Sequence, residues 1–493
     1  MDKELHETLR EKIRRAYTQI PSQGVYFNSR SAMQFTFKGA DDTIHRLYLD
    51  PVGSSAIVNA LVPKSGLIYR GGHGGGKTTL IEKVTHMLTS IPEDEIISAM
   101  IRGNDDQNVN TILASLKLGK LMHEGSEEVV WRKFVKCYVK IIDEVNRFPP
   151  PVQNALFEIL NKGRVEFIDN VYPETGGMDF VAYATENPND TGTYPLSKPF
   201  LDRFSFCVPA PQIPSASDQY LLAERPDDKL IGVKVEPVMK LEELKEARRI
   251  VSEDVHLSSD ALIYAIYLTQ AVSSCDRGDF NDKSHNELAV GDRCKGCGYD
   301  TTVSICAMTK TGLSGRAFLD FQRWGKGYAW FLNAFENPEK PEVQLETIET
   351  IAPYLMYHRV EPSEMVLGRD PFFGKKMSFY EDLVKKATQG YNTVKDALKD
   401  VPKVLRGDKQ PRKSDIYKVD KDLVIKTHFQ PLIEDAANTE FREIYEQIET
   451  QEIKPQTLQN LQLRLAFETE LKLPAQTYLL SKALAKVNKE DFI

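Results

Sequence analysis

The glycine-rich segment 71–78 constrains the fold of this 493-residue chain more than any other feature. It reads Gly-Gly-His-Gly-Gly-Gly-Lys-Thr, which is a complete phosphate-loop pattern G-x-x-x-x-G-K-T. The apolar run 67–69 precedes it, and residues 80–84 follow with helical spacing. A strand, a glycine turn and a helix start, in that order, gather backbone N–H groups into an anion-binding nest. The sequence therefore predicts that the chain binds a nucleoside triphosphate.

The end of this loop carries its two reactive side chains. Lys77 is expected to reach the β- and γ-phosphates, and the Thr78 hydroxyl is expected to bind Mg²⁺. The alternative is a flexible glycine loop that ends in Lys-Thr by chance, but both the spacing and the flanking pattern favour the phosphate loop. The predicted nucleotide-binding residues are Gly71, Gly72, His73, Gly74, Gly75, Gly76, Lys77, Thr78 and Thr79.

The overall composition narrows the class of protein. The net charge is −8, which argues against broad binding to nucleic acid or to anionic membranes, because phosphate contacts need a basic surface. No segment approaches the roughly 18 consecutive apolar residues of a membrane span, and the charged N-terminus lacks the apolar core of a signal peptide. Six cysteines in so long a chain do not make a disulfide scaffold. These features predict a cytoplasmic location.

Short apolar runs alternate with helical patterns from 66 to 206, and candidate strands at 67–70, 137–142 and 180–184 predict a parallel α/β core. Alternating runs at 33–37 and 45–49 predict a β-hairpin. The predicted domains are an N-terminal helix and β-hairpin extension at 1–59, an α/β nucleotide-binding core at 60–212, a helical lid at 213–399 with a cysteine-rich insertion at 273–311, a linker at 400–415 and a helical C-terminal extension at 416–493.

Two carboxylates follow the apolar run 139–142. Asp143 is placed to bind Mg²⁺, and Glu144 suits the base that activates the attacking water. Many strands end in acids that only cap the next helix, so the pair alone is weak evidence. Together with the phosphate loop upstream, the acidic pair becomes strong evidence for a nucleotide-hydrolysing site.

Two long segments carry a resemblance to a known family. IIDEVNRFPPPVQNALFEILNKGRVEF at 141–167 and ATENPNDTGTYPLSKPFLDRFSF at 184–206 resemble the MoxR family of AAA+ ATPases, in the helix-2-insert group that includes the magnesium-chelatase motor subunits. Weaker similarity extends to 351–359. The resemblance covers about 60–360 and implies an AAA+ core with a helical lid, which uses ATP and Mg²⁺ and hydrolyses ATP to ADP and phosphate.

The resemblance also implies catalytic roles for three residues besides the acidic pair. Asn187 resembles sensor 1, which holds the attacking water or the γ-phosphate; the alternative is a turn residue before proline. Arg203 resembles the arginine finger that acts on the neighbouring subunit's nucleotide; the alternative is an ion pair with Asp202. Arg316 resembles sensor 2, which reaches the γ-phosphate of its own subunit; the alternative is an exposed residue at a helix start. Arg147 is either a relay between subunits or a surface salt bridge.

A finger that acts on the neighbour implies a ring, a hexamer in this family. By the same resemblance, 99–125 is the helix-2 insert and 163–177 is the pre-sensor hairpin. Two motifs of the chain depart from the family: His73-Gly74 stands where the phosphate loop usually has Pro-Gly, and Gly315 replaces a usual proline in the sensor 2 motif. The N-terminal hairpin and the tail 416–493 are additions to the family pattern, and the cysteine cluster described next is the largest departure.

Four cysteines predict a structural zinc site in the lid. They fall within a short stretch, and the two-residue gap in Cys-Lys-Gly-Cys lets both sulfurs face one ion. His285 is an alternative ligand to the first cysteine, and four ordinary loop cysteines are the alternative to zinc. The predicted ligands are Cys275, Cys294, Cys297 and Cys306.

The function that these features favour is an ATP-driven ring that remodels, activates or assembles a client protein, as MoxR-like chaperones do, with a von Willebrand A-domain protein as an expected partner. The alternative is a nucleic-acid motor of a restriction or defence system. That would need a basic pore, whereas the insert segment IRGNDDQNVN is acidic and polar. A third possibility, a scaffold that binds nucleotide without hydrolysis, conflicts with the combination of acidic pair, sensor 1 and arginine finger.

Overall fold

A computed structural model describes most of the first 398 residues. The described residues are 3–25, 27, 32–38, 44–117, 122–123, 128–173, 177, 179–188, 190–210, 216–223, 233–273, 305–335 and 341–398. They divide into two units, of which the first contains the described residues of 3–261 and 313–384 and the second contains 262–273, 305–312 and 385–398.

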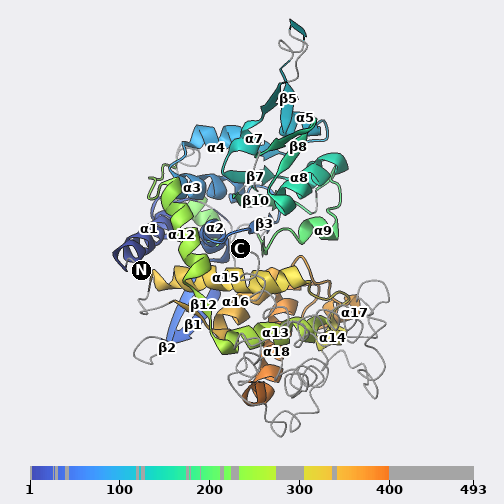
Figure 1. Ribbon diagram of the computed structural model, residues 1–493. Coiled ribbons are helices and arrows are strands. Elements are labelled where there is room, and N and C mark those ends of the chain that lie inside the picture. Colours follow the sequence, from blue (N-terminus) through green and yellow to red (C-terminus); the bar gives the residue numbers. More distant parts are fainter. Residues whose placement is uncertain are drawn as a thin grey trace, which may run out of the picture. The chain divides into compact units, whose positions relative to one another are not determined.

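The elements of the chain lie in the following order (Figure 1). The strands are β1 Met33–Lys38, β2 Ile44–Leu49, β3 Gly66–Arg70, β4 Ile101–Arg102, β5 Ala114–Leu116, β6 Val129–Trp131, β7 Val139–Asp143, β8 Val165–Phe167, β9 Asn170–Tyr172, β10 Val181–Glu186, β11 Phe206–Pro209, β12 His256–Leu257 and β13 Glu342–Val343. The helices are α1 Lys3–Ser22, α2 Pro51–Leu61, α3 Lys77–Thr89, α4 Glu93–Ala99, α5 Val109–Ile112, α7 Lys133–Lys136, η1 Val145–Arg147, α8 Pro150–Lys162, α9 Lys198–Leu201, α10 Ala216–Ala223, α12 Leu241–Glu253, α13 Ser259–Ser273, α14 Ile305–Met308, α15 Gly315–Asn333, α16 Leu345–Met356, α17 Glu364–Leu367 and α18 Lys376–Leu398.

A five-stranded parallel sheet forms the centre of the first unit. Its strand order is β11-β3-β10-β7-β4, so β10 lies between β3 and β7. The predicted parallel α/β core is confirmed, and the candidate strands correspond to β3, β7 and β10. All the strands run the same way, so the loops that follow β3, β7 and β10 meet at one edge of the sheet.

Three antiparallel hairpins flank this core. The predicted hairpin at 33–37 and 45–49 is β1 and β2, with Phe35 opposite Leu47. β5 lies within the segment 99–125 that is expected to be the helix-2 insert, and it pairs with β6, which follows that segment. The expected pre-sensor hairpin contains β8, which pairs with β9.

Stacked aromatic rings join the helices α15 and α16 to the sheet. The ring of Phe206 on β11 stacks on Trp324 of α15, with centroids 4.0 Å apart, and on Tyr354 of α16 at 5.3 Å. Trp324 is fully buried. Beside it, a Cβ at Gly327 would come within 2.6 Å of Val62, so glycine lets α15 approach the end of α2 closely. The position of α15 is therefore fixed against the strand that follows Arg203.

In the second unit, tyrosine side chains connect α13 to α18. The Tyr264 hydroxyl on α13 lies 2.7 Å from the Thr388 hydroxyl on α18, and the Tyr391 ring meets the rings of Tyr264 and Tyr267 edge-on. Cys306 is buried on α14. The other predicted zinc ligands, the alternative ligand His285, and the segments 400–415 and 416–493 lie outside the described residues. Among the described residues, no group of three or more acidic, histidine or cysteine side chains is arranged to hold a metal ion.

None of the helices in the described ranges combines the length and the apolar character needed to cross a membrane.

A buried lysine on strand β7 of the parallel sheet gives a test of the fold. The Lys140 side chain is 1% exposed and donates to the carbonyl oxygen of Val135 at 2.8 Å and to that of Cys137, which closes the end of α7. Burial lowers the pKa of Lys140 from 10.5 to about 8. Between these two values the unfolded chain binds more protons, so this lysine makes the free energy of unfolding rise with pH.

We expect the unfolding free energy of the wild type, relative to that of Lys140→Met, to be about 2 kcal/mol higher at a pH of about 9.5 than at a pH of about 7.5. Urea unfolding of both proteins at the two pH values measures this shift. A difference that does not change with pH would show that Lys140 titrates as an exposed lysine.

Candidate nucleotide site

The phosphate loop connects the buried strand β3 to α3. Gly76 precedes the helix with φ of 72°, a conformation that favours glycine. At Gly71 a Cβ would lie 2.2 Å from the carbonyl oxygen of Ala210, so the backbone passes too close to the end of β11 for a side chain. These two glycines fix the path of the loop, and the first turn of α3 then presents its free N–H groups beside it.

Lys77 lies across the loop. Its side chain is nearly buried, and its Nζ donates to the carbonyl oxygens of Gly71 at 2.8 Å and Gly72 at 2.5 Å. Burial lowers the pKa of Lys77, and the nearby carboxylates of Asp143 and Glu144 oppose this in part. A buried ammonium beside unpaired backbone N–H groups suits a polyanion such as a triphosphate.

Hydroxyl and carboxylate oxygens meet beside Lys77. Thr78 Oγ1 donates to Asp143 Oδ1 at 2.9 Å, and Thr185 Oγ1 donates to the same oxygen at 2.6 Å. The backbone N–H of Glu144 donates to Thr185 Oγ1 at 2.8 Å. Carboxylate oxygens are the ligands that Mg²⁺ prefers, and a phosphate-loop hydroxyl completes such a set. The residues present therefore fit Mg²⁺, with Thr78 and Asp143 as ligands.

Glu144 has an unusual backbone conformation for a residue with a side chain. Its φ of 51° and ψ of 53° lie in the left-handed region, and its carboxylate lines the same cavity as the phosphate loop. Oε1 lies 3.4 Å from His73 Nδ1, and Oε2 lies 3.3 Å from Arg147 Nε. Arg147 also pairs with Asp190, with Nε donating to Oδ2 at 2.9 Å. Of the two expectations for Arg147, the ion pair within the chain is present.

Asn187 follows β10 and is nearly buried. Its backbone carbonyl accepts from Asn146 Nδ2 at 2.8 Å, and its own Nδ2 lies 2.6 Å from His73 Nε2. It is therefore more than a turn residue. Because β10 lies between β3 and β7, its end brings Asn187 towards both the phosphate loop and Glu144.

These groups line a cavity of about 280 Å³ at the carboxyl ends of the strands. Thr79 and Glu186 complete its wall, and Glu186 pairs with Arg70, Oε1 accepting from Nη2 at 3.0 Å. Its lining consists of His73, Gly74, Gly75, Gly76, Lys77, Thr78, Thr79, Asp143, Glu144, Thr185, Glu186 and Asn187. Sequence reasoning identified this set except Thr185 and Glu186, and the signal it missed was a polar pair at the end of the strand before Asn187.

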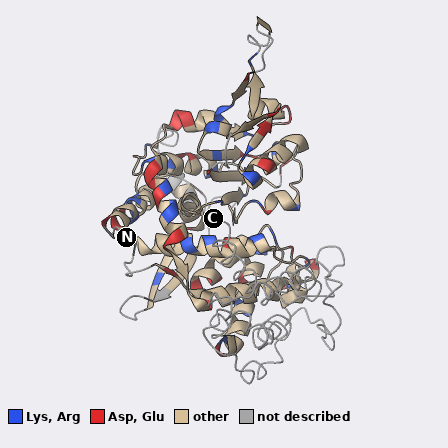
Figure 2. Cartoon of the chain, viewed as in Figure 1, with Lys and Arg blue, Asp and Glu red and all other residues tan. Residues whose placement is uncertain are grey.

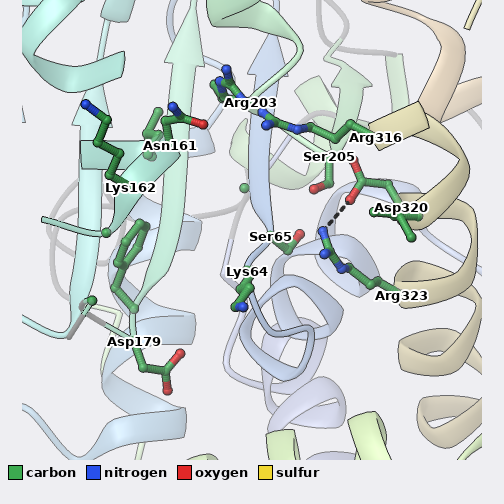
Figure 3. Close-up of a pocket in the computed structure, with 16 residues that line it drawn as sticks. Lys64, Ser65, Asn161, Lys162, Asp179, Arg203, Ser205, Arg316, Asp320 and Arg323 are labelled. Carbon is green, nitrogen blue, oxygen red and sulfur yellow. Dashed lines mark hydrogen bonds and ion pairs between the residues drawn. The ribbon is translucent and has the colours of Figure 1, made fainter. Parts of the chain in front are cut away.

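Arg203 and Arg316 lie elsewhere, in a second cavity of about 530 Å³ that shares no lining residue with the first. Figure 3 shows Arg316 extending from α15 towards Arg203. Gly66 and Ser205, which also line it, stand at the amino ends of β3 and β11. The structure therefore brings the two arginines together but does not bring Arg316 to the phosphate loop of its own chain.

Arg203 is not paired with Asp202. Its guanidinium lies 4.6 Å from the centre of the Phe157 ring, and Asp202 Oδ1 accepts instead from Arg359 Nε at 2.9 Å. Arg359 is buried and its Nη2 donates to Asp320 Oδ2 on α15 at 2.6 Å. Ser314 Oγ, at the start of α15, also donates to Asp202, at 3.2 Å. This network ties the turn with Arg203 to the helix with Arg316.

Residues 66–204 match the AAA domain of the dynein-related subfamily. A crystal structure from Cytophaga hutchinsonii, described as that of a "putative ATPase", has a similar fold with a TM-score of 0.55 and 18% sequence identity, over 78% of this chain and 96% of that chain. At this identity the similarity concerns the fold alone. The comparison with curated proteins finds no match.

The Thr185 hydroxyl bridges the two acidic residues, because it donates to Asp143 Oδ1 and accepts from the Glu144 N–H. This bridge can be tested by substitution. Thr185→Val keeps the shape but leaves the Glu144 N–H without its acceptor, so we expect the free energy of unfolding to fall by about 1–3 kcal/mol. Thr185→Ser keeps the hydroxyl and is the matched control, with a smaller loss. Urea unfolding of the three proteins measures both values, and equal stability of Thr185→Val and the wild type would contradict the bridge.

Proposed function

We propose, on the premise that residues 66–204 form an AAA domain, that the chain hydrolyses ATP in a ring whose neighbouring subunits complete each site. The observation that carries this proposal is the separation of the two half-sites. The phosphate loop, Asp143, Glu144 and Asn187 lie at the carboxyl ends of the parallel strands, and Arg203 and Arg316 lie at the amino ends.

Each subunit supplies most of the chemistry. The loop N–H groups and Lys77 hold the triphosphate, and Thr78 and Asp143 hold Mg²⁺, which neutralises charge on the phosphate oxygens when bound. Glu144 takes a proton from water as the water oxygen bonds to the γ-phosphorus and the bond from that phosphorus to the β,γ-bridging oxygen breaks. Asn187 orients the water or the γ-phosphate.

The arginines act on the next subunit. A five-residue parallel strand spans about 16 Å, so a cavity at the amino ends faces away from the chain's own phosphates. Cations dominate that cavity, which suits the nucleotide of an adjoining copy, and Figure 2 shows Lys and Arg along α15. The cationic residues are Lys64, Lys162, Arg203, Arg316 and Arg323. We therefore assign Arg316 to the neighbour's nucleotide together with Arg203, in place of the expected role on its own.

The ring is proposed to be a hexamer that remodels a client protein, with a von Willebrand A-domain protein as partner. In this proposal, the antiparallel hairpins β5–β6 and β8–β9 are the elements that nucleotide-driven motion displaces against the client. Stimulation of the ATPase by DNA and by no protein would replace this proposal with the nucleic-acid motor. The zinc site at Cys275, Cys294, Cys297 and Cys306 also stays a proposal, and metal analysis of the purified protein tests it.

The role of Glu144 predicts a separation of binding from turnover. We expect Glu144→Gln to bind ATP within about threefold of the wild type and to lose turnover by about 100-fold or more, since the amide cannot accept the proton of water. Fluorescent-nucleotide titration and phosphate release measure the two quantities. Hydrolysis at the wild-type rate would contradict the assignment.

Mixed oligomers test the shared site. Arg203→Ala keeps an intact pocket without a finger, and Glu144→Gln keeps an intact finger without a base. Each alone is expected to be nearly inactive, whereas an equimolar mixture regains about one quarter of wild-type activity, the fraction of interfaces that join an intact pocket to an intact finger when subunits mix at random.

The control is a mixture of Glu144→Gln with the double variant Arg203→Ala, Glu144→Gln, which contains no complete interface. Arg316→Ala should behave as Arg203→Ala does in the same mixtures. Mixed oligomers verified by native mass spectrometry that regain no activity would contradict the assignment of the finger to the neighbour.

A further inference from the structure

The phosphate loop carries one side chain that the phosphate-loop pattern does not require. His73 stands at a variable position of that pattern, and its side chain is 57% exposed at the mouth of the nucleotide cavity. Nε2 lies 2.6 Å from Asn187 Nδ2 and Nδ1 lies 3.4 Å from Glu144 Oε1. The imidazole thus touches both groups to which the proposed reaction assigns the attacking water.

We propose that His73 is a positioning residue for hydrolysis, which holds the Asn187 amide and the Glu144 carboxylate at a set spacing around the point of attack. This inference rests on the proposed ATPase function. A histidine loosely placed on an exposed loop would not meet partners from the ends of two different strands, β7 and β10, at the same time.

The contacts of His73 with Asn187 and Glu144 fit one tautomer of the neutral imidazole ring. When Asn187 Nδ2 donates to Nε2, the neutral imidazole carries its proton on Nδ1. That N–H faces Glu144 Oε1, so one ring accepts from the amide and presents its donor to the carboxylate. The amide oxygen of Asn187 then stays available to water, and one carboxylate oxygen is oriented.

Arg147 explains why Glu144 needs this second partner. Its guanidinium lies 3.3 Å from Glu144 Oε2 and is itself held by Asp190. Asp190 Oδ2 is also 3.6 Å from His73 Nε2. With His73 removed, the Glu144 carboxylate keeps its contact with Arg147 but loses the one with the loop histidine, so it turns towards Arg147 and away from the phosphate loop.

The experiment compares His73→Ala, His73→Gln and the wild type as full-length protein. We expect His73→Ala to lower kcat by about tenfold or more, because small misplacement of reacting groups costs factors of this size. Its KM and its affinity for fluorescent ATP should stay within about threefold, because the backbone nest and Lys77 are unchanged. Unchanged affinity also shows that the variant is folded.

His73→Gln distinguishes positioning from simple loop packing. Glutamine supplies both an N–H and a carbonyl oxygen, so it can replace the two contacts and should recover most of the lost kcat. His256→Ala, which removes an exposed histidine on β12, is the matched control and should behave as the wild type.

Two results would overturn the inference alone: a kcat for His73→Ala within about twofold of the wild type, or a His73→Gln as slow as His73→Ala. In both cases the loss of turnover in Glu144→Gln would leave the proposed function intact. A wild-type oligomer that hydrolyses no ATP with Mg²⁺ would overturn both together.

Discussion

The common direction of the strands is the constraint on which the candidate site depends. Because β3, β10 and β7 are parallel neighbours, their carboxyl ends bring Lys77, Asn187 and Glu144 to one edge. The same polarity puts the turn before β11, with Arg203, at the other edge. A single chain cannot fold both sets of groups around one phosphate, and this geometry underlies the proposal of an assembly of copies.

Features of the site that are local in the sequence could be predicted, and those that depend on distant packing could not. The phosphate loop and the acidic pair are each recognised from a pattern of a few consecutive residues. The place of Arg316 depends on how Trp324 stacks on Phe206, more than a hundred positions earlier in the chain, and no local pattern encodes that contact. The helix α2 was missed because it is buried on every side and shows no amphipathic period.

The departure of the phosphate loop from the family pattern, a histidine at position 73, has a structural counterpart in the site. In the sequence, the histidine at position 73 is only a departure from the usual Pro-Gly of the phosphate loop. In three dimensions its ring reaches Asn187 and Glu144, while Arg147 contacts the other carboxylate oxygen of Glu144 and is paired with Asp190. Glu144 is thus held between two basic side chains, and its left-handed backbone conformation aims it between them. Composition gave no sign of this arrangement, because each residue is ordinary by itself.

The buried pairing of Arg359 with Asp202 and Asp320 has a mechanical consequence. Such a pair is costly to break, by about 3–5 kcal/mol when one partner is lost. The turn that holds Arg203 and the first turns of α15 are therefore expected to move as one body. In the proposed ring, a tilt of α15 in one copy would therefore carry Arg203 and Arg316 together against the nucleotide pocket of the next copy.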